Sequence, residues 1–212
     1  MELIIVNIVV VIVVILISMT LHEFMHGFVA YKLGDDTPKD EGRLTLNPIS
    51  HIDPFLTILL PVLLVIMGGP VFGGAKPVPF NPSRVKGGEW GVALVALSGP
   101  FTNLILAFIG YGALHFIAPE MGSLLNLSLS TFMYVNLGFF VFNMLPIPPL
   151  DGSRLLYALA PDFVRRVMEQ IEGFGLILVF LIVFLGSGFI GTIISSATGI
   201  IVTAFRSIFA IF

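Results

Sequence analysis

The amino-acid sequence predicts an all-α polytopic membrane protein with about five to six membrane segments, including a re-entrant segment that is followed by a hairpin loop. The chain of 212 residues is 57% hydrophobic and only 11% charged, whereas a soluble domain carries about 25% charged residues. Long apolar runs also recur along the whole sequence. We therefore expect one membrane-embedded domain over residues 1–212, with a core at about 1–160 and accessory helices at about 165–212.

Charge and cysteine content restrict the function. A formal net charge of −3 indicates neither nucleic acid nor an acidic partner. The sequence contains no cysteine, so disulfides and thiolate metal sites are excluded, and any metal ion must be bound by nitrogen and oxygen atoms. The length leaves no room for a separate soluble sensor or binding domain.

The first apolar segment is expected to be a retained signal-anchor helix from about Leu3 to Leu33. A cleaved signal peptide would begin with basic residues and end at a small-residue cleavage site. Neither feature accompanies the run from Leu3 to Ile17. The apolar run continues instead into a group of ionisable residues.

The later apolar segments differ in length. The second has only thirteen uninterrupted residues, Phe55 to Met67, and includes Pro61. A spanning helix needs about 20 residues, so this segment is too short to cross. The others run from about Trp90 to Ala118, Leu124 to Leu145, Phe174 to Leu185 and Ile190 to Phe212, and Arg206 interrupts the last.

Basic residues indicate how the segments are oriented. They follow the first segment, precede the third and follow the fourth: Lys32, Lys39 and Arg43; Lys76, Arg84 and Lys86; Arg154, Arg165 and Arg166. The turns at 119–123 and 186–191 contain no Lys or Arg. The positive-inside rule places the three basic loops in the cytoplasm. We therefore expect a multi-pass protein of the cell membrane whose second segment enters and leaves on one side.

A stretch rich in glycine and proline, GGPVFGGAKPVPFNP, follows the second segment. Irregular backbone at membrane depth persists only where protein or water satisfies its polar groups. We expect a hairpin or extended loop, although an ordinary cytoplasmic loop is the alternative. Pro77, Pro79 and Pro82 alternate with residues that can donate a hydrogen bond, so one edge is expected to stay open for strand pairing.

The five residues HEFMH lie at the end of the first apolar run. On a helix, His22 and His26 share one face, which suits two imidazoles on one Zn²⁺, with Glu23 beside a bound water as the general base. The alternative is a polar group near the membrane surface with Glu23 solvated. Ionisable residues in an apolar helix are costly and usually functional, so we expect a metal site here.

A catalytic zinc needs a third protein ligand and an open position for water. Asp151 is favoured, because it follows the prolines of NMLPIPP, which break the fourth segment at about the depth of the histidines. His115 falls on the opposite side, and His51 and Asp53 lie in a loop that is expected to be interfacial. The alternative role for Asp151 is the N-cap of the next helix, and both roles are compatible.

Two asparagines lie within apolar segments: Asn103 in SGPFTN and Asn143 in FNMLP. An amide that faces lipid is costly. Either side chain could donate a hydrogen bond to a substrate carbonyl or a developing oxyanion. The alternative is hydrogen bonding between helices.

Together HEFMH, GGAKPVPFNP, SGPFTN and NMLPIPPLDG, which span about Leu21 to Leu156, resemble the site-2 protease family of intramembrane zinc metalloproteases. The resemblance implies a three-helix core that holds one zinc ion near the cytosolic face. It implies that His22, His26 and Asp151 bind the zinc and that Glu23 activates water. It also implies a hairpin around Gly73 to Asn81 that helps to hold an extended substrate. The sequence lacks the PDZ and CBS domains of many relatives.

The resulting hypothesis is a zinc-dependent endopeptidase that cleaves transmembrane segments of membrane proteins within the lipid bilayer. A zinc or proton transporter is one rival, but it needs a polar path to both faces, and the outer halves of the segments are strongly apolar. A structural membrane subunit is the other, and it would tolerate the loss of Glu23.

Overall fold

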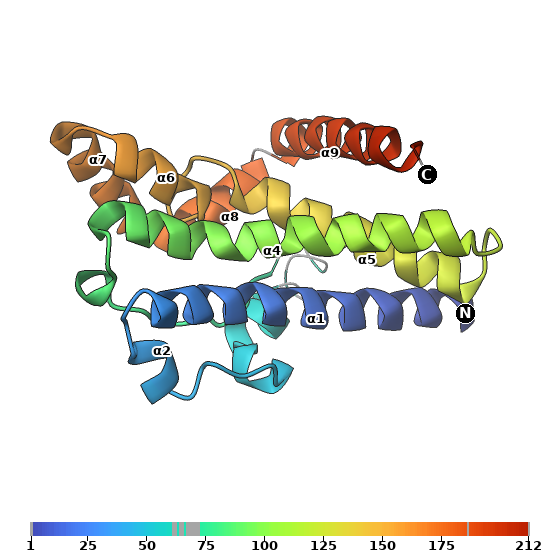
Figure 1. The fold of residues 1–212 in the computed structure, drawn as a ribbon, viewed down its shortest axis with the longest axis horizontal. Helices are drawn as coiled ribbons and strands as arrows, with labels where there is room; N and C mark the ends of the chain where they lie inside the picture. Colours follow the sequence, from blue (N-terminus) through green and yellow to red (C-terminus); the bar gives the residue numbers. More distant parts are fainter. Residues whose placement is uncertain (1, 61–62, 64–65, 67–72, 186, 212) are drawn as a thin grey trace.

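The computed structural model describes residues 2–60, 63, 66, 73–185 and 187–211. Over these residues the chain is helical and contains no strand, as the sequence predicts. Within the described part of the chain, four helices are long and apolar enough to cross a membrane: Ile4–Lys32, Gly88–Ile117, Leu124–Asn143 and Gly188–Phe209. Three of them lie side by side along the long axis of the molecule (Figure 1).

The first helix, α1 (Glu2–Lys32), has nearly the bounds expected from the sequence. Its first half is rich in valine and isoleucine, which favour strands in water. In lipid no water satisfies the backbone, so an isolated spanning segment must be helical. A helix of 31 residues is ~46 Å long, which exceeds the ~30 Å hydrocarbon core of a bilayer.

The other core helices are α4 (Gly88–Ile117) and α5 (Leu124–Asn143). α4 runs antiparallel to α1, and α5 returns beside both (Figure 1). Gly110 permits the close approach of α4 and α5, because a Cβ there would lie 3.4 Å from Cα of Met133. One buried apolar cluster joins α1 to α4 and the loop before α4, and consists of Ala30, Val85, Val92 and Val95. Another joins α4, α5 and the last helix, and consists of Ala107, Met133, Leu137 and Phe205.

Four helices follow the core: α6 (Gly152–Leu159), α7 (Asp162–Glu172), α8 (Gly175–Leu185) and α9 (Ser187–Phe209). Arg206, whose charge interrupts the last apolar run of the sequence, lies within a continuous helix, because α9 extends through it to Phe209. The Arg206 side chain is exposed, while the neighbouring Phe205 packs on Phe108 and Tyr111 of α4. The charge therefore points away from the helix contact.

The connection from α1 to α4 contains the short helix α2 (Thr37–Asp40), the 3₁₀ turn η1 (Pro48–His51), the π-helical turn η2 (Pro54–Leu59) and the 3₁₀ turn η3 (Pro82–Arg84). Much of the predicted re-entrant segment, including Pro61, lies outside the described residues. Its two flanks are adjacent, since the amide of Gly74 donates to the carbonyl oxygen of Leu56 at 3.0 Å.

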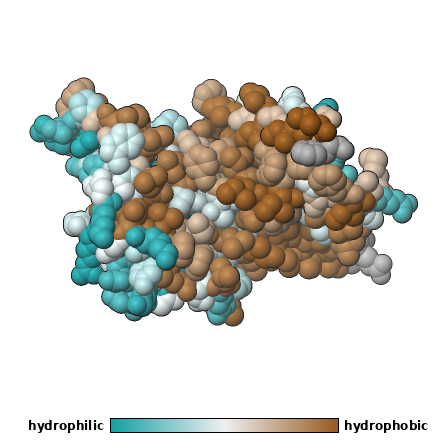
Figure 2. Space-filling model, in the orientation of Figure 1, coloured by the Kyte–Doolittle hydropathy of each residue, from teal (hydrophilic) through white to brown (hydrophobic). Residues whose placement is uncertain are grey.

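The surface divides along the bundle axis (Figure 2). Hydrophobic residues cover most of its length, and hydrophilic residues gather at the end where α2 and α7 lie (Figures 1 and 2). The same end carries the basic residues that follow α1 and precede α4, because the amide of Lys86 donates to the carbonyl oxygen of Leu33 at 2.9 Å. One end of the bundle is thus polar and carries these Lys and Arg residues.

Candidate metal centre

Three ligand atoms converge between α1 and the turn that precedes α6. Nε2 of His22 lies 3.0 Å from Nε2 of His26, and Oδ2 of Asp151 lies 3.2 Å from the first nitrogen and 3.5 Å from the second. Ligands ~2.0–2.1 Å from a tetrahedral zinc are separated by about 3.3–3.4 Å. The three atoms therefore have the spacing of one face of a zinc tetrahedron.

The second nitrogen of each imidazole is already paired. Nδ1 of His22 donates to Oδ1 of Asn103 at 2.6 Å, and Nδ1 of His26 donates to the carbonyl oxygen of Val95 at 2.8 Å. These bonds keep the proton on Nδ1, so both Nε2 atoms offer lone pairs toward Asp151. Partners of this kind orient metal-binding histidines and raise their basicity. The donor set and its supports therefore fit a zinc ion.

Asp151 reaches the histidines because the chain turns sharply before α6. A Cβ on Gly152 would lie 2.4 Å from the carbonyl oxygen of Met144, so only glycine permits this approach of the α6 start to the end of α5. Asp151 occupies the N-cap position, but its side chain makes no capping hydrogen bond. The Asp151 carboxylate therefore does not cap α6, although the sequence allowed that role.

Glu23 lies between the two histidines in sequence and is fixed from outside its own helix. Its Oε2 accepts a 2.8 Å hydrogen bond from the backbone amide of Val78. The Val78 side chain also packs closely against α1, because a Cβ on Gly27 would lie 2.9 Å from Cγ1 of Val78. The glycine- and proline-rich stretch thus lies beside the candidate general base.

Comparison with known proteins identifies the family. The chain is 43% identical to "Putative zinc metalloprotease YwhC" of Bacillus subtilis over 203 residues, which cover 91% of this chain and 89% of that protein. The chain belongs to peptidase family M50. The model of that family matches residues 118–186, which include Asp151 and the helices α5 to α8.

More distant relatives support the same assignment. Two proteins named Rip2, with the same description as zinc metalloproteases, come from Mycolicibacterium smegmatis and Mycobacterium tuberculosis strain H37Rv. They are 32% and 31% identical over 76% and 80% of this chain, and the matches cover 61% and 64% of their own lengths. No solved structure gives a significant match. This M50 peptidase is thus a zinc metalloendopeptidase of the site-2 protease type.

The M50 peptidase supports His22 with a chain of amides that the sequence analysis did not foresee. Asn103 is fully buried, and its amide nitrogen donates to Oδ1 of Asn136 on α5 at 2.8 Å. The amide nitrogen of Asn136 in turn donates to Oγ of Ser18 on α1 at 2.9 Å. Each of the three core helices contributes one member. In the sequence, Asn136 is a further asparagine within an apolar run, like Asn103 and Asn143, and this position indicates a buried hydrogen bond.

The two asparagines selected from the sequence therefore have different surroundings. The Asn103 side chain faces His22, and its amide nitrogen is used between helices, which favours a role in orienting the histidine over contact with an oxyanion. The amide nitrogen of Asn143 donates to the carbonyl oxygen of Phe139 in its own helix at 3.0 Å. The predicted substrate role of Asn143 stays a prediction.

The remaining histidines lie elsewhere in the M50 peptidase. The ring of His51 is buried; its Nε2 donates to the carbonyl oxygen of Thr45 at 2.9 Å, and its Nδ1 lies 3.5 Å from the Arg43 guanidinium. His115 packs on Phe116 and Phe209 near the other end of α4. Among the described residues only His22, His26 and Asp151 form a group with metal-ligand spacing.

The segment 73–81 of this peptidase is extended and its amides face inward. Three alternate amides donate to neighbouring parts of the protein: Gly74 to the carbonyl oxygen of Leu56 (3.0 Å), Lys76 to that of His51 (2.8 Å) and Val78 to Glu23 (2.8 Å). These three donors therefore do not form the open edge that the sequence suggested. In extended backbone successive residues direct their polar groups to opposite sides, so the other edge belongs to Ala75, Pro77 and Pro79, whose backbone groups make no hydrogen bond to the described residues.

Asp35 anchors the far end of this segment, outside the spanning helices. Its carboxylate accepts hydrogen bonds from the amide of Asn81 at 2.5 Å and from the hydroxyl of Thr37 at 2.6 Å. Burial raises the pKa of Asp35, but the hydrogen bonds from Thr37 and Asn81 and the charge of Arg84 outweigh it, so the pKa lies below its ordinary value. The anchor is therefore ionised at neutral pH.

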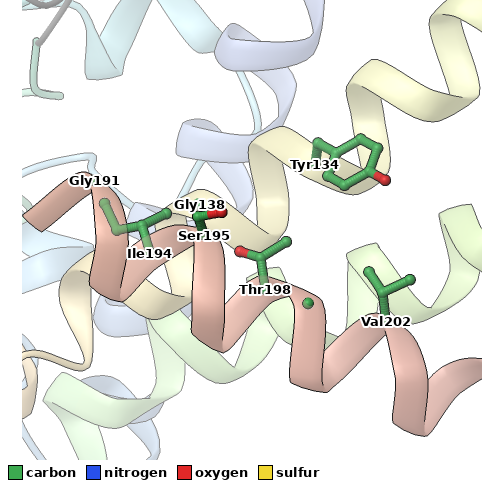
Figure 3. A pocket seen from close by; sticks show the side chains of 8 residues that line it. Tyr134, Gly138, Gly191, Ile194, Ser195, Thr198 and Val202 are labelled. Carbon is green, nitrogen blue, oxygen red and sulfur yellow. The ribbon is translucent and has the colours of Figure 1, made fainter.

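A separate groove of about 520 Å³ lies between α5 and α9. Tyr134 and Gly138 line it from α5, and Ser195, Thr198 and Val202 line it from α9 (Figure 3). Its lining contains no carboxylate or imidazole. It is therefore distinct from the metal centre of the M50 peptidase.

Proposed function

We propose that this M50 peptidase hydrolyses peptide bonds within transmembrane segments of membrane proteins, at one zinc ion per chain bound by His22, His26 and Asp151. The observation that carries the proposal is the spacing of the three ligand atoms, 3.0–3.5 Å, within a bundle of apolar helices. The histidines precede Lys32 by ten and six residues, or ~15 and ~9 Å along the axis. This depth supports a substrate bond that also lies within the membrane.

The chemistry divides between the ion and Glu23. A zinc ion bound there polarises the substrate carbonyl and lowers the pKa of its water. Glu23 shares the ligand helix but coordinates nothing itself, so its carboxylate is free to take a proton from water and deliver it to the leaving amine. The amide of Val78 holds one carboxylate oxygen, which leaves the other for this transfer. Asn103 and Val95 keep the two imidazoles in one tautomer and orientation.

A transmembrane helix must unwind locally before its peptide bond can be attacked, and its freed backbone groups then need partners. Segment 73–81 supports strand pairing, although with a restricted chemistry. Pro77 and Pro79 have no amide hydrogen, so the open edge provides carbonyl acceptors and a single donor, the amide of Ala75. A substrate that pairs here would therefore mainly donate its own amides.

The proposal includes an orientation in the cell membrane with the polar end of the bundle, which carries most of the Lys and Arg residues, in the cytoplasm. The adjacency of Leu56 and Gly74 supports a second segment that enters and leaves on one side. Single cysteines at Lys39, Ser83 and Arg165 should react with a membrane-impermeant reagent from the cytoplasmic side only, and one at Gly122 from outside. Labelling of Ser83 from outside would show that the second segment spans. The whole chain forms one domain, in which α7 to α9 are accessory to the core.

The deciding experiment is cleavage of a reporter helix, a single-span segment of leucine and alanine interrupted by one Gly-Pro pair, reconstituted with the peptidase in phosphatidylcholine vesicles. Glu23→Gln should lower cleavage by at least about 10²–10⁴-fold, the usual contribution of a general base, and retain zinc. Asp151→Ala should lose zinc and activity together. His51→Ala should retain zinc, because its ring is bonded to Thr45. Cleavage by Glu23→Gln near the wild-type rate would refute the assignment.

A further inference from the structure

A second groove, of about 380 Å³, runs along α1 on the membrane side of Glu23. One wall consists of α1 residues, and the other consists of the loop before η1 and the start of η1: Leu16, Ile17, Thr20 and Leu21; Leu46 and Pro48. None of the described residues that line it is charged. Its lining is apolar except for one hydroxyl, that of Thr20, which is the kind of surface that accepts an aliphatic side chain.

The hydroxyl of Thr20 lacks a partner among the described residues. The residue is only 4% exposed, and its Oγ1 makes no hydrogen bond to the described part of the chain. Three other helical threonines donate to the carbonyl oxygen four residues earlier, at 2.8 Å in each case: Thr102 to Ser98, Thr192 to Gly188 and Thr203 to Gly199. A buried polar group without a partner costs free energy, so this hydroxyl is suited to a ligand that supplies one.

The groove and the candidate general base lie on adjoining parts of one helix. With 3.6 residues per turn, Leu16, Thr20 and Glu23 fall on one face of α1, and Thr20 precedes Glu23 by ~4.5 Å along the axis. Viewed down the helix axis, the groove residues and the histidines lie on opposite sides of Glu23. A peptide that passes Glu23 on its way to the metal centre would therefore have its next residues, toward the membrane interior, near Thr20.

We infer that this groove is a substrate subsite, in which an apolar side chain on the membrane-interior side of the cleaved bond packs against Leu16 and Leu46 while the Thr20 hydroxyl bonds a peptide group of the unwound backbone. The inference rests on the proposed function. A lipid acyl chain would fit the apolar walls, but it has no donor or acceptor for Thr20. An unwound peptide provides both an aliphatic side chain and unpaired backbone groups.

Replacement of the hydroxyl separates this role from a structural one. Thr20→Val is isosteric and removes an unpaired buried hydroxyl, so the thermal midpoint of unfolding should be unchanged or raised. In the reporter assay, kcat/KM should nevertheless fall about tenfold, the value of one hydrogen bond, with zinc content unchanged. Thr20→Ser keeps the hydroxyl and should restore most of the rate. An unchanged kcat/KM for Thr20→Val in an active enzyme would overturn the subsite alone, whereas an inactive, zinc-loaded wild type would overturn the proposed function as well.

Photocrosslinking identifies the occupant directly. A benzoylphenylalanine at Leu46, in a Glu23→Gln background that retains substrate, should crosslink to the reporter helix on the membrane-interior side of its cleavage site. The same group at Ile49, an exposed residue of η1 outside the groove, is the matched control and should give little reporter product. Crosslinks from Leu46 to lipid alone, or equal reporter products from both positions, would overturn the inference.

Discussion

The backbone amide of Val78 donates a 2.8 Å hydrogen bond to Oε2 of Glu23, although the two residues are 55 positions apart in the sequence. This contact joins the glycine- and proline-rich segment to the proposed general base. The segment therefore has two roles in the proposed mechanism. Its inner edge orients the carboxylate, and its outer edge is available to the substrate.

Val78→Pro removes the amide hydrogen and should lower kcat for the reporter helix by at least about tenfold, since a hydrogen bond to a charged group is worth ~1.5–3 kcal/mol. Zinc should stay bound, because Val78 contacts no ligand atom. Val78→Ala keeps the amide and is the matched control, so it should lose much less activity. Equal losses in both variants would assign the effect to side-chain packing on Gly27.

Asn136→Leu should weaken zinc binding although Asn136 touches neither imidazole. Without Oδ1 of Asn136, the amide of Asn103 loses a partner and holds His22 less firmly, and supporting residues of this kind change metal affinity by about 10–100-fold. A competition titration with a chromophoric chelator measures the affinity. Asn143→Leu is the control, since its amide bonds within its own helix. Equal zinc affinities in Asn136→Leu and the wild type would show that the amide chain does not act on the metal centre.

Gly99→Ala should abolish zinc binding while the bundle stays folded. A Cβ there would lie 2.5 Å from Nε2 of His26 and 2.7 Å from Nε2 of His22, and would occupy space beside the ligand atoms. Gly138→Ala adds a Cβ that meets nothing within 4 Å and should leave the zinc content unchanged. Metal analysis and circular dichroism check both variants. A zinc-loaded Gly99→Ala enzyme would show that the two helices separate readily.

The Asp35 anchor should weaken in acid. Its folded-state pKa is lowered, so its contribution to stability is complete above the unfolded value of about 3.9 and is lost as the pH falls through the folded value. Hydrogen exchange at the Asn81 amide should accelerate there relative to neighbouring amides. Asp35→Asn should show fast exchange already at neutral pH. Asp36→Asn changes an exposed neighbour whose side chain makes no capping bond, and should behave as the wild type.

The sequence was sufficient for the parts of this protein that depend on local pattern. The apolar runs gave α1, α4 and α5 to within a few residues, because lipid permits only helices in such runs. Asp151 could be paired with His22 and His26 because prolines broke the fourth segment at a matching depth. These inferences needed only periodicity, proline chemistry and the position of charge.

Contacts between distant segments could not be predicted in the same way. The partner of Asn103 depends on how α4 and α5 are rotated against each other, which a strongly apolar pattern does not specify. The inward direction of the Val78 amide depends on the docking of segment 73–81 against α1. The sequence alone left open how the last segment accommodates Arg206, because a charge in lipid is costly but a long side chain can extend from a continuous helix.

The open edge of segment 73–81 also bears on whether copies of this protein associate with one another. Exposed strand edges commonly pair with identical edges, which leads to aggregation. Two copies of the edge formed by Ala75, Pro77 and Pro79 would oppose carbonyl to carbonyl, with too few amides to form a ladder. In the proposed mechanism these prolines favour a substrate that donates its own amides, and for the same reason they oppose pairing between neighbouring copies of the peptidase at this edge.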